Sequence, residues 1–282
     1  MIQGPKKQIE SDIVIRIVKN CPKSYDDTKR VLLVDADSIC YLASYFPEDS
    51  LMTFPSEEEQ IEEAKFRVRN KLQEIQNNVE EHFNIISCML FVGGKGNFRY
   101  KIYPEYKANR KNAIKSDILP IVQDYMLEIG CIKAHNAEAD DYVIEAMKDV
   151  VGNCVIACID KDVIYHAPEV PIYDYRSHTD VLGEFKYITH QESRYARACQ
   201  VLIGDVSDGV KGAVGIGKAY CDKNLTPDMT DYQFIRAIFT GYLKSTKGNS
   251  VEAKKQMKLN YNLLKLHTQE EIKQLMQHYE NK

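Results

Sequence analysis

Short runs of β-branched residues alternate with helical segments between residues 31 and 188, and this alternation limits the folds available to the chain. In the helical segments, apolar residues recur every three or four positions. Strands connected by helices form parallel sheets, so we predict an α/β fold with a mostly parallel central sheet flanked by helices. The predicted strands are residues 31–35, 85–92, 154–160 and 170–173, and the predicted helices are residues 38–46, 57–82, 116–129 and 139–150.

The pattern becomes helical after about residue 189. We predict helices at residues 192–203, 216–223, 231–243 and 251–266, followed by a short C-terminal helix. The chain is therefore divided into an N-terminal extension at 1–30, to which the sequence assigns no role, an α/β domain at 31–188 and a helical region at 189–282.

The composition is that of a globular protein, with 282 residues of which 44% are hydrophobic and 28% charged. No apolar stretch approaches the roughly 20 residues of a membrane span, and the N-terminus lacks the pattern of a signal peptide, so we expect no membrane partner and a cytoplasmic location. The eight cysteines form no C-x-x-C pair and no Cys/His cluster. We therefore expect reduced, buried thiols and neither a disulfide framework nor a zinc site.

Four acidic clusters stand where predicted strands end or helices begin. Their main members are Asp35, Glu138, Asp140, Asp141, Asp160, Asp162, Asp205 and Asp208. The carboxyl ends of parallel strands meet in one crevice, so acids from distant parts of the chain can converge there. Convergent carboxylates repel one another unless cations neutralise them, and carboxylates suit Mg²⁺ or Mn²⁺. Two such ions about 4 Å apart can activate a water and clamp a scissile phosphate.

Each cluster taken alone has a second interpretation, because aspartates at strand ends and helix N-termini are often caps and turn formers. The occurrence of four clusters in one predicted crevice favours metal binding. Capping explains Asp140 and Asp160 least well, whereas Asp37 is predicted to be a helix cap and not a ligand.

The net charge of −4 seems unfavourable for binding nucleic acid. If the eight clustered acids hold metal ions, however, 37 basic residues face 33 of the 41 acidic ones. Residues 93–110 interleave cations with aromatic rings, and Lys95, Arg99 and Tyr106 in this segment are candidates for contact with phosphates and bases. The other interpretation is a solvated loop whose tyrosines cover apolar surface.

A glycine-rich segment at residues 209–219 nearly fits a phosphate-binding loop of NTP-hydrolysing proteins. Ala219 stands where a Ser or Thr hydroxyl would hold Mg²⁺, and no strand precedes the segment, so NTP hydrolysis is not favoured. A hairpin between two helices, with backbone N–H groups directed at a duplex phosphate, explains the glycines better. The residues predicted to bind nucleic acid here are Lys211, Gly212, Gly215, Gly217 and Lys218.

These segments together resemble the 5′-nuclease family, which includes bacteriophage 5′-exonucleases, the 5′-nuclease domain of bacterial DNA polymerase I and eukaryotic flap endonucleases. The motifs that carry the resemblance are Tyr-Lys-Ala-Asn-Arg at 106–110, Glu-Ala-Asp-Asp at 138–141, Asp-Lys-Asp at 160–162 and the segment 204–218. The resemblance extends over about residues 31–225. It implies a PIN-like 5′-nuclease core, with a C-terminal duplex-binding region that contains a helix-three-turn-helix.

The resemblance also implies roles for individual residues. The eight clustered acids match the metal-binding acids of the family, with Asp160, Asp162, Asp205 and Asp208 serving the second site. Lys107 and Arg110 match the catalytic basic residues that contact the reacting phosphodiester. The helix-three-turn-helix of relatives holds a K⁺ ion, and the small size of this chain is more typical of a bacteriophage enzyme than of a cellular one.

The chain departs from the family after the predicted strand 85–92, where relatives carry a further metal-site aspartate and this chain has Gly93 and Gly94. The first metal site is thus short of one acid. A water could replace that ligand, with weaker metal affinity, or activity could have been lost. The segment between Arg110 and Leu119 is also short, so any arch for threading a 5′ single strand would be small.

We therefore expect a monomeric, metal-dependent 5′-3′ exonuclease or flap endonuclease that cuts DNA or RNA primers near 5′ junctions, with RNase H-like primer removal and replication proteins as partners. The expected substrates carry a 5′ flap, a nick, a recessed end or an RNA/DNA primer duplex. The alternatives are a catalytically weakened, structure-specific DNA-binding protein, an RNA-degrading PIN-type nuclease and, less favoured, an NTP-dependent enzyme.

Overall fold

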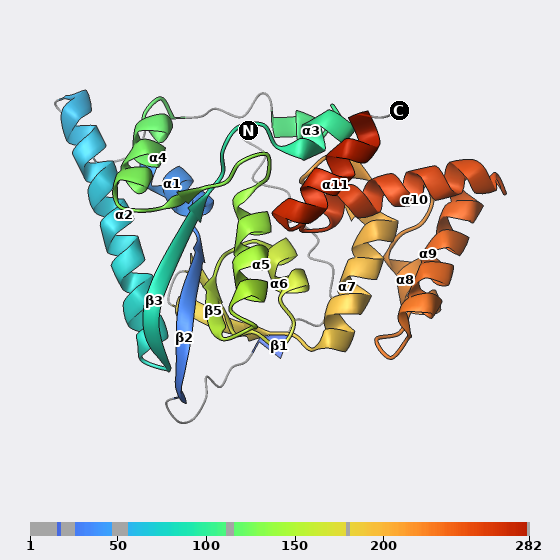
Figure 1. Ribbon diagram of the computed structural model, residues 1–282, viewed down its shortest axis with the longest axis horizontal. Coiled ribbons are helices and arrows are strands. Elements are labelled where there is room, and N and C mark those ends of the chain that lie inside the picture. Colours follow the sequence, from blue (N-terminus) through green and yellow to red (C-terminus); the bar gives the residue numbers. More distant parts are fainter. Residues whose placement is uncertain (1–15, 18–25, 47–55, 111–115, 179–180, 281–282) are drawn as a thin grey trace, which may run out of the picture.

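A twisted seven-stranded sheet in the order β1-β7-β6-β5-β2-β3-β4 forms the centre of the described chain (Figure 1). The computed structural model describes residues 16–17, 26–46, 56–110, 116–178 and 181–280. The parallel strands are β2 (Asp26–Asp35), β3 (Phe83–Val92), β4 (Ile132–Lys133), β5 (Cys154–Ala157) and β6 (Ile172–His178). Two antiparallel strands, β7 (Val181–Tyr187) and β1 (Arg16–Ile17), extend the β6 edge. The predicted mostly parallel α/β fold is confirmed.

Helices cover both faces of the sheet, and the side chains of β2 show how. Leu32 and Val34 pack into the core on one face, while Leu33 between them packs into the core on the other. This alternation is the two-residue period of a strand buried on both sides. The first face is covered by α1 (Asp37–Ser44), α2 (Glu57–Glu80) and α4 (Leu119–Glu128), and the second by α5 (Ala139–Asp149) and α6 (Lys161–His166).

Side-chain caps explain several of the helix starts. The hydroxyl of Ser56 accepts a hydrogen bond from the backbone N–H of Glu59. The hydroxyl of Thr189 likewise accepts one from the backbone N–H of Glu192, and the carboxylate of Glu192 accepts one from the backbone N–H of Thr189. Such caps satisfy N–H groups that have no partner within the helix. The caps at Ser56 and Thr189 place the starts of α2 and of α7 (His190–Ile203) within two residues of the predicted positions.

The C-terminal part is helical, as predicted, and has its own core. Tyr242, which is buried in that core, donates its hydroxyl hydrogen to the backbone oxygen of Val201. A short ladder of β8 (Gly204–Asp205) and β9 (Val210–Lys211) follows the first helix of this part. The helices are α7 (His190–Ile203), α8 (Lys218–Asn224), α9 (Asp231–Ser245), α10 (Ser250–Leu264) and α11 (Gln269–Glu280).

Several elements differ from the prediction. β2 begins at Asp26, so the predicted extension at 1–30 contributes part of a central strand as well as β1. The short helices α3 (Phe98–Ile102), η1 (Ala108–Arg110) and α6 lie in segments predicted as loop or strand. One or two turns give too few residues for a helical period to be visible in the sequence.

The helical part packs directly on the sheet domain. Ile272 of α11 packs against Phe98 of α3, and Leu266 joins the core beneath α5. Cys88 is exposed on β3, contrary to the expectation of buried thiols, whereas the other described cysteines are buried and none forms a disulfide. None of the helices in the described ranges is long and apolar enough to span a membrane.

A buried arginine joins α3, α5 and the end of α10. Arg99 is 1% exposed and donates to both carboxylate oxygens of Asp141, at 2.6 and 2.9 Å. It also donates to the backbone oxygens of Leu263 and Lys265, at 2.8 and 2.9 Å. Asp141 in turn accepts from the backbone N–H of His267 at 2.8 Å. The charges of this pair are therefore fully hydrogen-bonded inside the protein.

We predict that Arg99→Met lowers the free energy of unfolding by about 3–5 kcal/mol, because it leaves the buried Asp141 charge without a counter-ion. Urea denaturation measures the loss. Lys101→Met, at an exposed position of the same helix, is the matched control and should change stability little. The double variant Arg99→Met/Asp141→Leu should recover part of the loss. Equal stability of Arg99→Met and the control Lys101→Met would contradict this role of Arg99.

Candidate metal and nucleic-acid site

Acids from four segments meet beyond the carboxyl ends of the parallel strands. Asp35 is the last residue of β2, and Asp160 follows β5, which pairs with β2 in parallel. Glu138 and Asp140 lie at the start of α5, which covers this part of the sheet. The register of parallel strands thus brings together acids that are far apart in the sequence.

Three of these acids, Asp35, Asp140 and Asp160, form no ion pair with any lysine or arginine of the described chain. Burial, together with the neighbouring charges of Asp37 and Asp160, raises the pKa of Asp35 to about 8. Burial also raises the pKa of Asp140 well above its usual value, with Asp35 and Glu138 adding to the effect. When ionised, these carboxyls would therefore carry negative charge that the protein's own cations do not balance.

The other acids beside this group carry basic partners. The ammonium of Lys107 forms an ion pair with Glu138, and the guanidinium of Arg110 binds Asp208 at 2.8 Å. Burial alone would lower the pKa of Lys107, but Glu138 and Asp208 raise it, so Lys107 stays charged. Lys107 has a φ of 51° and donates its backbone N–H to the oxygen of Asp208 at 2.8 Å, which fixes the start of η1 against the acids.

The structure corrects two assignments in the basic segment. Arg99, predicted to contact nucleic acid, is buried against Asp141, and both oxygens of Asp141 are occupied by Arg99 and backbone N–H groups. Tyr106, also predicted to contact bases, is 1% exposed, and its hydroxyl bonds Glu138 at 2.9 Å and Asp208 at 2.8 Å. We infer that Arg99, Asp141 and Tyr106 position the neighbouring acids.

Asp37 is placed differently from its prediction as a helix cap. No side chain caps α1, and Asp37 is the first residue of that helix. Its Oδ1 accepts the backbone N–H of Gly93, 56 residues away, at 2.7 Å. Burial raises the pKa of Asp37, and the charge of Glu138 raises it further. The carboxylate therefore belongs to the acidic group, and only the spacing of two residues from Asp35 could have indicated this.

The two glycines after β3 leave no room for side chains. A Cβ on Gly94 would lie 1.9 Å from the backbone oxygen of Ala134, and one on Gly93 would lie 2.7 Å from Oδ2 of Asp37. Because real Cβ atoms do not approach so closely, an aspartate at either position would force the surroundings to shift. The position beside Gly93 is instead filled by the carboxylate of Asp37.

The second group of acids is held by two residues that sequence patterns missed. Gln200 of α7 donates its side-chain amide to Asp162 at 2.7 Å and to Asp205 at 3.3 Å. Lys161 forms an ion pair with Asp205 at 2.8 Å. Asp160 caps α6 by accepting the backbone N–H of Asp162 at 2.8 Å, so the acid that capping seemed to explain poorly is a cap after all.

The donor set suits a hard divalent cation, because it offers several carboxylate oxygens, and the pKa values of these carboxyls are raised first by burial and then by one another's charges. As the side chains stand, no three Asp, Glu, His or Cys residues of the described ranges are close enough to hold an ion together. A bound cation would therefore have to draw the carboxylates inward. The residues that fit this role are Asp35, Asp37, Glu138, Asp140 and Asp160 near β2, and Asp162, Asp205 and Asp208 near α7.

The glycine-rich segment lies next to the basic one. The side-chain amide of Asn109 donates to the backbone oxygens of Val206 and Ser207 at 3.1 and 3.2 Å, which ties the two segments together. A Cβ on Gly212 would collide with Ile203, so this glycine serves close packing and not phosphate contact. Gly215, with a φ of +75°, and Gly217 face open space. Lys95, Lys211 and Lys218 are exposed, and the predicted arch lies mostly in 111–115, outside the described residues.

Comparison with known proteins agrees with this architecture. A family model described as the 5′-3′ exonuclease N-terminal resolvase-like domain matches residues 30–192. A bacteriophage T5 protein crystallised with metal ions is 13% identical, with a TM-score of 0.57 over 89% of this chain and 98% of that chain. The bacteriophage T5 flap endonuclease in a complex with DNA and metal ions is 14% identical, with a TM-score of 0.54 over the same shares. At these identities the likeness shows the fold.

We predict that, without divalent cations, the stability of the wild type relative to Asp35→Asn falls as pH rises from about 4 to about 8. Asp35 has a pKa of 3.8 in the unfolded chain and about 8 in the fold, so over this range the folded state binds the extra proton and rising pH favours unfolding. Melting temperatures in chelator across this range measure the effect. Added Mg²⁺ should raise the melting temperature more at pH 8 than at pH 5, and an equal rise at both values would contradict the assignment.

Proposed function

The chain belongs to the 5′-3′ exonuclease family, with the N-terminal resolvase-like domain at residues 30–192, and on this basis we propose that it hydrolyses phosphodiesters near 5′ ends and junctions of nucleic acids. The observation that carries the proposal is the group of unbalanced acids, Asp35, Asp140 and Asp160, beside the cations Lys107 and Arg110. A phosphodiester needs both kinds of group, because metal ions bind to the acids and the cations bind its remaining charge.

We propose Mg²⁺ or Mn²⁺, two ions in all, as the metal cofactor of these acids. When bound, such ions supply an activated water and stabilise charge on the phosphate oxygens. The first ion would bind to Asp35, Asp37, Glu138 and Asp140, and the second to Asp160, Asp162, Asp205 and Asp208. This assignment replaces Asp141, whose oxygens are occupied by Arg99, with Asp37.

Lys107 and Arg110 would exchange partners when substrate arrives. Both now bind acids of the site, and Arg110 has about half of its side chain exposed. A scissile phosphate beside Glu138 and Asp208 would offer negatively charged oxygens to Lys107 and Arg110. These oxygens would replace the two carboxylates as partners, because the carboxylates would then bind the metal ions. The side chains of Asn109 and Arg110 both donate to the backbone oxygen of Ser207. These contacts would keep Lys107 and Arg110 close to Asp208 before and after the exchange of partners.

Duplex binding would come from the exposed part of the glycine-rich segment. Gly215 and Gly217 present backbone without side chains, and Lys211 and Lys218 add positive charge on the same segment. We propose that a K⁺ ion assists here, and that the substrates carry a 5′ flap, a nick or a recessed end, including RNA primers. Contacts of this kind ignore base sequence and select the shape of the nucleic acid.

Gly94 supports a second candidate function. The backbone there cannot accept the aspartate that the family resemblance leads us to expect, because its Cβ would meet the Ala134 oxygen. If Asp37 does not compensate, the first ion is bound too weakly for turnover, and the protein would be a structure-specific DNA-binding protein. Measured cleavage and metal affinity separate the two candidates.

We predict that the protein cuts a 5′-labelled flap duplex near its junction in Mg²⁺ or Mn²⁺ and not in chelator. Asp160→Ala should slow cleavage by about 100-fold or more, since it removes one of the acids proposed to bind the second ion. Asp149→Ala, an exposed acid at the end of α5, is the matched control and should cut normally. Flap binding without product in either metal would leave the DNA-binding candidate.

We predict that Asp37→Asn weakens Mn²⁺ binding about 10-fold or more, because the amide keeps the hydrogen bond from Gly93 and removes only the charge. Calorimetric titration measures the affinity directly and does not depend on turnover. The melting temperature in chelator should stay the same or rise, since one repulsive charge is lost. An unchanged Mn²⁺ affinity would show that Asp37 is not a ligand.

A further inference from the structure

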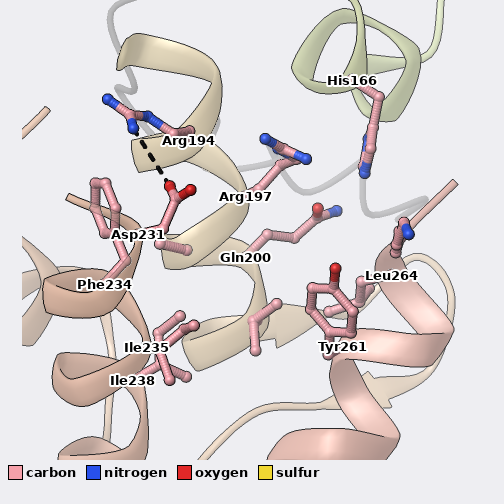
Figure 2. Close-up of a pocket in the computed structure, with 13 residues that line it drawn as sticks. His166, Arg194, Arg197, Gln200, Asp231, Phe234, Ile235, Ile238, Tyr261 and Leu264 are labelled. Atoms are coloured by element: carbon pink, nitrogen blue, oxygen red, sulfur yellow. Dashed lines mark hydrogen bonds and ion pairs between the residues drawn. The ribbon is translucent and has the colours of Figure 1, made fainter. Parts of the chain in front are cut away.

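A cavity of about 340 Å³ lies between α7, α9 and α10, and none of the acids that the proposed function uses lines it (Figure 2). Phe234 and Ile238 of α9 and Leu264 of α10 give it an apolar wall. Arg197 and Gln200 of α7 give it a polar one. A concave site of this size, mostly apolar and with a few polar groups, is typical of small-molecule sites at their lower limit of volume.

Arg197 stands in this cavity without an acidic partner among the described residues. Its Nε is buried and makes no hydrogen bond. Burial lowers the pKa of Arg197, the nearby Tyr261 and Asp231 oppose that shift, and Arg194 adds to it. The side chain is partly buried, and leaving its buried Nε without a partner costs free energy, so the missing partner calls for an explanation other than stability.

The other charges around the cavity are already balanced. Arg194 pairs with Asp231 at 3.3 Å, as the dashed line in Figure 2 shows, and Lys265 pairs with Glu271 at 2.6 Å. His166 is neutral, because its Nε2 accepts the backbone N–H of Leu266 while its Nδ1 bonds the backbone oxygen of Asp162. The cavity therefore carries one uncompensated positive charge, on Arg197.

We propose that this cavity is a binding site for a small organic oxyanion. Its phosphate or carboxylate group binds to the guanidinium of Arg197, which matches such groups with paired N–H donors. Its compact apolar or aromatic body packs against Phe234 and Ile238. Figure 2 shows Arg197 and Gln200 extending from α7 toward the space between His166 and Tyr261, which leaves the guanidinium facing the cavity.

Gln200 lies in the cavity wall and also hydrogen-bonds Asp162 and Asp205, so the site is separate from the acids but adjacent to them. A probe that carries phosphate must therefore be tested in chelator, where no metal ion can hold it at the acids. The site does not rest on the proposed nuclease function, and its test needs no turnover.

The test is calorimetric titration of the full chain with phenyl phosphate in chelator. We expect one site, with inorganic phosphate and phenol each binding about 10-fold or more weakly, because each lacks one half of the interaction. Benzoate and thymidine 5′-monophosphate are further probes: tighter binding of benzoate assigns a carboxylate group, and tighter binding of the nucleotide assigns a nucleotide ligand.

Arg197→Met should weaken phenyl phosphate binding about 10- to 100-fold, whereas Arg236→Met, an exposed arginine of α9 outside the cavity, should not. In the absence of probe, Arg197→Met should keep or raise the melting temperature, because it removes a partly buried charge that forms no ion pair in the described chain. Equal binding by both variants, no saturable binding by the wild type, or a large loss of stability in Arg197→Met would each overturn the proposal.

Discussion

Repulsion between buried carboxylates is the constraint on which the rest of this structure depends. Parallel strands end at one edge of the sheet, so Asp35 and Asp160 are brought together by the same register that builds the core. Their charges cannot all be balanced by the protein without losing the site. The fold balances some of them, through Lys107, Arg110 and Lys161, and leaves Asp35, Asp140 and Asp160 unbalanced. This division between balanced and unbalanced acids decides where a metal ion can be held.

The residues around the acids are better understood as supports than as contacts. Arg99 and Tyr106 carry a charge and a hydroxyl that seem suited to nucleic acid, yet both are buried and bonded to acids. Gln200 and the backbone N–H of Gly93 act in the same way on Asp162 and Asp37. Carboxylates that repel one another must be oriented by donors. Gln200 and Gly93 each bond one oxygen of their carboxylate, whereas Arg99 occupies both oxygens of Asp141.

The sequence predicted the sheet and most of the long helices, because hydrophobic periods of two and 3.6 residues survive over such lengths. It missed α3 and α6, which are too short to show a period, and β1 and β7, whose pairing depends on distant partners. At the site, motif spacing located the acids but could not show which ones are balanced. Arg99 beside Asp141 illustrates the limit, since a cation 42 residues away decides whether an acid is available.

The hydrogen bonds of Arg99 also determine when, during synthesis of the chain, this part of the protein can reach its final structure. Its partners include the backbone oxygens of Leu263 and Lys265, and Asp141 needs the N–H of His267. On a ribosome, α3 and α5 are synthesised long before this last part of α10 and the residues that follow it. The sheet can form early, but until the chain has passed His267 the guanidinium and the carboxylate lack their full set of partners. The support that Arg99 and Asp141 give to the acidic group is thus complete only once His267, 126 residues after Asp141, has been synthesised.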